Sequence, residues 1–78
     1  MPRYFFDTRD DDTFIEDDVG VELADLEAAK EVAATSLAEL ALDVLPTSLR
    51  RELVVEVRDK VQCVLKTFLH FEAVIVVA

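Results

Sequence analysis

Cysteine and histidine each occur once in the chain, at Cys63 and His70, and they are the first candidates for a catalytic pair. A thiol and an imidazole act as nucleophile and base only within hydrogen-bond reach of each other. Seven positions on one predicted strand separate them by about 23 Å and place them on opposite faces. We therefore interpret Cys63 as a buried small apolar residue and His70 as a surface side chain.

The other residue types that support catalysis also lack a suitable context. Ser36 and Ser48 are not part of a nucleophile-elbow motif. A single glycine, Gly20, excludes a glycine-rich phosphate loop, and no cysteine and histidine spacing matches a zinc site. The sequence predicts no catalytic residue, no cofactor and a non-enzymatic protein.

Acidic residues form two short runs that could offer oxygen ligands to Ca²⁺ or Mg²⁺. The runs comprise Asp10, Asp11, Asp12, Asp17 and Asp18. The alternating aspartates of a calcium loop, with glycine at position six and glutamate at position twelve, are absent. We expect solvated turns without a metal, in which the carboxylates repel one another. Such a protein becomes more stable when salt is added or the pH is mildly lowered.

Charge is strongly negative and unevenly distributed. The 78 residues carry 17 acids and eight Lys or Arg, a net charge of −9, and residues 1–49 hold thirteen of the acids and three of the bases. This balance repels nucleic acid and anionic membranes and favours a basic protein as partner. The length predicts a single domain over residues 1–78.

Compartment follows from the cysteine count and the N-terminus. One cysteine cannot form an internal disulfide, the start of the chain lacks the apolar segment of a signal peptide, and no stretch approaches the length of a membrane span. These features predict a cytoplasmic protein.

Hydrophobic periodicity predicts two hairpins separated by a long helix. Arg3–Thr8 and Thr13–Ile15 are β-prone on either side of the first acidic run. Asp25 is the expected cap of a helix from Leu26 to about Leu45, closed by Pro46. Its apolar residues share one stripe: Leu26, Ala29, Ala33, Leu37, Leu40 and Val44.

The second hairpin joins Leu53–Arg58 to Val61–Phe71. The topology is then ββαββ, an α+β fold with one long helix packed on a four-stranded, mainly antiparallel sheet. Odd positions of both strands are expected to face the helix: Leu53, Val55, Val57, Cys63, Leu65, Leu69 and Phe71.

Apolar residues outside this core predict self-association. Val54, Val64 and Phe68 interrupt the polar face of the second hairpin, and Val74, Ile75 and Val76 extend its last strand beyond any partner. A domain this small gains little from its own core, so we expect a homodimer. The extension pairs either with the first strand of its own chain or with a second copy.

Several segments carry a resemblance to a family of small bacterial proteins of unknown function. They are Met1-Pro2-Arg3-Tyr4-Phe5-Phe6-Asp7, the run from Asp18-Val19-Gly20 to Ala28-Ala29, and Val57-Arg58-Asp59. The likeness spans about residues 1–71 and implies a helix-on-sheet domain without an assigned activity. Residues 10–12 and 60–62 depart from it, where such proteins usually carry glycine.

The leading hypothesis is a non-enzymatic cytoplasmic domain that self-associates and binds protein partners. The alternative comes from a weaker similarity, of a hairpin followed by an acidic helix, to HicB-type antitoxins, which neutralise a small basic RNA-cleaving toxin. It implies an acidic surface that binds a basic protein.

Overall fold

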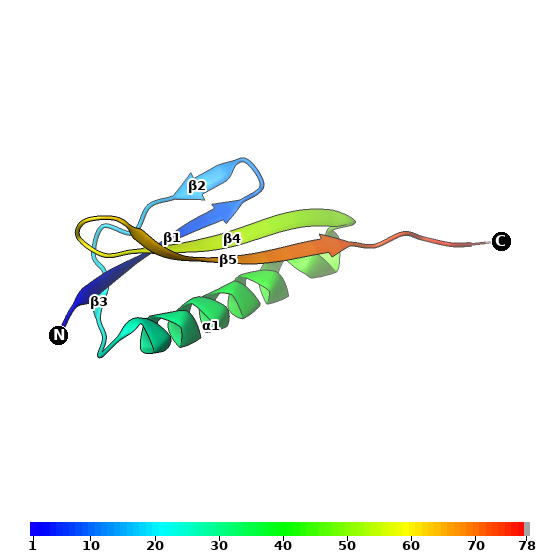
Figure 1. Cartoon of the computed structure of the whole chain (residues 1–78). Coiled ribbons are helices and arrows are strands. Elements are labelled where there is room, and N and C mark those ends of the chain that lie inside the picture. The colour runs from blue at the N-terminus through cyan, green and yellow to red at the C-terminus, as the bar shows by residue number, and fades with distance from the viewer. Residues whose placement is uncertain (78) are drawn as a thin grey trace.

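One helix lies against one face of a mainly antiparallel sheet in the computed structural model, which describes residues 1–77 (Figure 1). The strands are β1 (Arg3–Asp10), β2 (Thr13–Ile15), β3 (Val21–Glu22), β4 (Arg50–Arg58) and β5 (Cys63–Glu72), with α1 (Leu26–Val44) and a 3-10 turn, η1 (Leu45–Thr47), between β3 and β4. The order across the sheet is β2-β1-β4-β5, and β3 also pairs with β1. The predicted α+β fold is confirmed, with β3 as a fifth strand.

The core lies between α1 and the two central strands. Leu53, Val55 and Val57 alternate along β4 and are almost completely buried against the helix. Ala29, Ala33 and Leu37 of the predicted stripe are buried from the helix side, and Tyr4 completes the cluster. The two alanines let α1 approach the sheet closely.

The ends of α1 are fixed by side chains, as the sequence predicts. The Asp25 carboxylate accepts a hydrogen bond from the Ala28 N–H at 2.9 Å and so caps the first turn. Pro46 lies in η1, directly after the last turn of α1. The hydroxyl of Ser48, the residue that follows η1, donates to the Val44 carbonyl at 2.6 Å. Over the described residues, no helix combines the length and apolarity needed to cross a membrane.

A β-bulge in β5 overturns part of the predicted face assignment. Arg58 pairs with Cys63 and Val57 pairs with Leu65, so Val64 is an extra residue between them. Beyond the bulge the alternation reverses. Cys63 is therefore exposed and not buried, and Val64 packs against the core instead of joining Val54 and Phe68.

Aspartates make both hairpin turns where glycine is missing. Asp11 adopts a positive φ of 51° in the β1–β2 turn, a conformation that aspartate tolerates better than most residues. Asp59 accepts hydrogen bonds from the Val61 and Gln62 N–H groups and closes the β4–β5 turn. Its pKa is lowered by these two bonds.

The C-terminal segment does not continue β5 as a strand, contrary to expectation. The Ala73 N–H donates to the Leu49 carbonyl at 2.7 Å, and residues 74–77 then run past the end of the sheet (Figure 1). The predicted pairing with the first strand of the same chain is therefore wrong, and the pairing with a second copy stays a prediction. Ala78, the last residue of the predicted segment, lies outside the described residues.

We expect replacement of Asp25 by alanine to lower the free energy of unfolding by about 1 kcal/mol, because the cap bond to Ala28 is lost. Urea denaturation of both proteins measures the difference. Asp43→Ala is the matched control, since Asp43 is an exposed acid in the last turn of the same helix and its removal does not touch the cap. Equal losses for the two variants would show that the cap contributes nothing specific.

Candidate functional site

The sheet face opposite α1 is uncovered and carries paired charges. Glu56 lies 3.8 Å from Lys66, and Arg50 lies 3.1 Å from Glu72, each pair joining β4 to β5. His70 on β5 contacts Glu52, which lies directly opposite it on β4. Exposed pairs of this kind contribute little to the stability of the hairpin.

Aromatic and aliphatic side chains form one row across the middle of this open face. The register places Phe14, Arg9, Val54 and Phe68 side by side on β2, β1, β4 and β5. The Arg9 guanidinium stacks 4.7 Å from the centre of the Phe14 ring. Phe68 is 68% exposed, and we call this row the open-face strip.

A polar cluster at one end of the face ties three segments together. Asp7 is the one buried charged residue in the described chain, and its carboxylate accepts a hydrogen bond from Arg58 Nε at 2.8 Å. The other Asp7 oxygen accepts from the Asp17 N–H at 2.9 Å. Arg58 Nη2 also donates to the Asp17 carbonyl at 2.7 Å, and its guanidinium stacks on Phe5.

On the side of β1 that pairs with β2 and β3, the Asp17 carboxylate takes the place of a strand carbonyl for the N–H of Phe6. This carboxylate accepts hydrogen bonds from the N–H groups of Phe6, Val19 and Gly20 at 3.0 to 3.1 Å. Burial acts to raise its pKa, but these bonds together with Arg58 outweigh it and hold the pKa below the ordinary value. The ionised carboxylate is thus part of the folded loop.

Gly20 is required at the loop because the backbone approaches its neighbours closely. Its φ is +77°, and a Cβ there would lie 2.9 Å from both the Phe5 ring and the Tyr4 carbonyl. The loop therefore depends on glycine at position 20 as well as on the hydrogen bonds to Asp17.

The acidic turns are paired, which corrects the expected repulsion. Arg51 binds Asp10 through two hydrogen bonds of 2.6 and 2.8 Å and lies 3.5 Å from Asp11. This bond to Arg51 lowers the pKa of Asp10. Asp12 and Asp18 are exposed. Paired carboxylates lose stability as the pH falls, the opposite of the predicted response.

Cys63 and His70 do not form a reactive pair. Cys63 and His70 are both exposed, at opposite ends of β5, and the reversed alternation at the bulge puts them on one face without bringing them together. Residues 1–77 contain no group of three His, Cys, Asp or Glu side chains that could hold a metal ion. Asp7, Asp17 and Arg58 are bonded to one another and to backbone.

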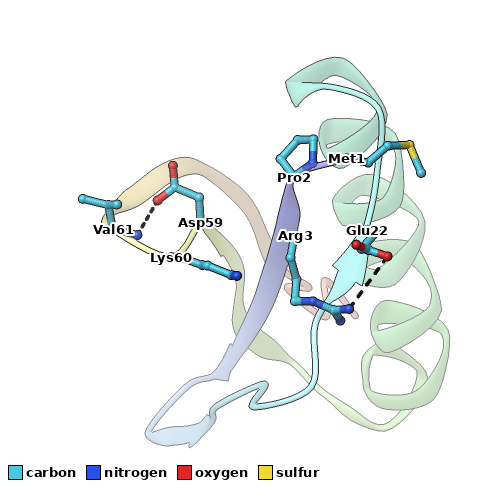
Figure 2. A pocket seen from close by; sticks show the side chains of 7 residues that line it. All are labelled: Met1, Pro2, Arg3, Glu22, Asp59, Lys60 and Val61. Carbon is cyan, nitrogen blue, oxygen red and sulfur yellow. Dashed lines mark hydrogen bonds and ion pairs between the residues drawn. The ribbon is translucent and has the colours of Figure 1, made fainter.

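A shallow pocket of about 290 Å³ lies beside the first residues of the chain (Figure 2). Its lining comprises Met1, Pro2, Arg3, Glu22, Asp59, Lys60 and Val61. The charged groups satisfy local partners: Arg3 lies 3.9 Å from Glu22, and Asp59 accepts backbone hydrogen bonds in its own turn. The pocket holds both signs of charge and no nucleophile paired with a base, so its side chains indicate no reaction.

Apolar surface gathers instead around β5, the long edge of the sheet. The predicted interface residues Val54 and Phe68 are neighbours on the open face, whereas Val64 lies in the bulge. Val74, Ile75 and Val76 are 74%, 69% and 90% exposed, and Val77 is 81% exposed. These four residues form what we call the apolar tail.

The polar cluster was not predicted, although the sequence contained a signal for it. Asp7, Gly20 and Arg58 all lie within the segments that carry the family resemblance. Periodicity could not associate them, because 51 positions separate Asp7 from Arg58. The cluster is a structural centre that shapes the open face.

One family model covers most of the chain. The family model described as a domain of unknown function, DUF6894, matches residues 3–68. No curated protein and no solved structure matches the chain. The apolar tail lies beyond the matched residues.

We expect the free energy of unfolding to fall as the pH is lowered below about 4. Asp10 and Asp17 have lowered pKa values in the folded chain, so their stabilisation is complete above the ordinary aspartate pKa of about 3.9 and is lost as the pH falls through the folded-state values. Denaturation at several pH values measures this slope.

Asp17→Asn should cost about 1–3 kcal/mol at pH 7, since one oxygen and the charge that accept backbone N–H groups are removed. The variant should also show a shallower acid slope than the parent. Asp18→Asn is the control, because Asp18 is the exposed neighbour in the same loop. If both variants behave alike, the Asp17 network does not stabilise the loop.

Proposed function

We propose that this chain, which belongs to the DUF6894 family of domains of unknown function, is a non-enzymatic, cytoplasmic domain that self-associates and binds protein partners. One observation carries the proposal: the apolar tail, residues 74–77, stands almost fully exposed next to an uncovered strand edge. Contiguous exposed apolar surface of this kind is typical of interaction sites.

The small core supports self-association. Among residues 1–77, the largest fully buried side chains are those of Leu53, Val55 and Val57. The chain has no disulfide, since Cys63 is its single cysteine. Burial of further apolar surface against a second copy is one way to stabilise a domain of this size. The exposed free thiol of Cys63 suits a reducing compartment such as the cytoplasm.

A second proposal, an antitoxin-like neutraliser of a small basic protein, draws on the outer face of α1. Glu31 and Glu39 are exposed there and line a shallow hollow with Val32, Thr35 and Ser36. A basic partner would be steered to this face by charge. Replacing Glu31 and Glu39 with glutamine would weaken such binding and leave self-association unchanged, which separates the two proposals.

Light scattering at rising protein concentration tests self-association directly. We expect a mass near twice the 8.8 kDa of one chain. A mass that stays at one chain in concentrated solution contradicts the proposal.

The triple variant Val74→Ser, Ile75→Ser and Val76→Ser should raise the dissociation constant of the dimer at least tenfold, because each substitution removes apolar surface that association would bury. Val61→Ser is the control, since Val61 is 87% exposed in the β4–β5 turn, at the other end of β5 from the tail. If Val61→Ser weakens the dimer as much as the triple variant, the tail is not the contact.

A further inference from the structure

We propose that residues 73–77 of a second copy add as a strand to the free edge of β5, so that two chains exchange tails about a two-fold axis. This inference rests on the self-association proposed above and specifies its geometry. Strand addition supplies main-chain hydrogen bonds for affinity and side-chain pockets for specificity.

The two edges of the sheet differ in how open they are. One edge is formed by β2 and β3, which are three and two residues long and therefore offer little backbone for pairing. The other edge is β5, ten residues long and paired on one side only, with β4. Figure 1 shows the tail leaving from the end of this same strand, clear of the helix.

Two hollows between α1 and β5 offer places for the side chains of an added strand. At one end a hollow of about 510 Å³ is lined by Leu26, Glu27, Lys30 and Leu65. At the other end a hollow of about 290 Å³ is lined by Ala41, Leu42, Leu45, Pro46 and Phe71. Leu65, Leu69 and Phe71 are only half-buried, because α1 does not cover β5 completely.

One antiparallel register places the whole tail on the regular part of β5. With Phe71 opposite the partner's Phe71, the partner's tail runs antiparallel along β5 from Phe68 to Leu65, the residue next to the bulge at Val64. On the side that faces α1, the partner's Val77 then lies opposite Leu65. On the open face, the partner's Val74 lies opposite Phe68 and extends the open-face strip. His70 faces the partner's Glu72, an acceptor for its ring N–H.

Charge permits this approach although each chain carries a net charge of −9. Residues 50–78 contain five bases and four acids, so the β4–β5 side of the molecule is nearly neutral. The acidic first half lies on the other strands and on the helix. A partner with the same charge distribution can therefore reach the β5 edge with little repulsion.

Disulfide trapping between two single-cysteine variants tests the register. In a Cys63→Ser background, Phe68→Cys and Val74→Cys place thiols on exposed positions that face each other across the proposed interface. Paired Cα atoms in an antiparallel sheet are about 5.5 Å apart, within the range a disulfide spans. Within one extended chain the two positions are about 20 Å apart, so an internal bond cannot form.

We expect a mixture of the two variants, combined under reducing conditions and then oxidised, to yield a covalent dimer, and each variant alone to yield none. Val76→Cys mixed with Phe68→Cys is the offset control and should trap at least tenfold less. Trapping of Phe68→Cys with itself, or no trapping in the mixture while light scattering still reports a dimer, overturns the tail exchange but not self-association. A monomer in light scattering overturns both.

Discussion

The guanidinium of Arg58 joins the two halves of the chain. It binds the buried Asp7 on β1, the Asp17 carbonyl in the loop before β3, and the ring of Phe5. Because Asp7 in turn accepts the Asp17 N–H, one cation sets the path of the loop that leads to α1. An unpaired buried carboxylate is costly, so the pairing also explains how an acid can sit inside so small a domain.

A single helix can cover only one face of the sheet, so the other face must be compatible with solvent. Leu53, Val55 and Val57 use the covered face, whereas their neighbours on β4 face solvent. On the uncovered face, ion pairs and stacked arginines replace a second layer. The apolar residues that no layer covers, above all Phe68 and the tail, are the ones available to a partner.

Sequence patterns predicted the elements whose signals are local. The alternation at Leu53, Val55 and Val57 and the cap at Asp25 are confirmed. The helical stripe is confirmed from Ala29 to Val44, whereas Leu26, its first predicted residue, is 45% exposed because it lies beyond the part of α1 that packs on the core. The bulge at Val64 escaped prediction, because one extra residue reverses every side chain before it without any change in composition. The pairing of the acidic turns also escaped prediction, since Arg51 and Arg58 lie 40 or more positions from the aspartates they contact.

The central pairing of β1 with β4 has a consequence for how the protein forms. Arg9 and Val54 are adjacent in the sheet although 45 positions separate them in the chain. When the chain emerges from a ribosome, β1 comes first and has only β2 and β3 beside it until β4 and β5 have been made. Contacts between such distant residues are slow to close. The negative charge of the first half opposes association of unfinished chains, because like charges repel one another.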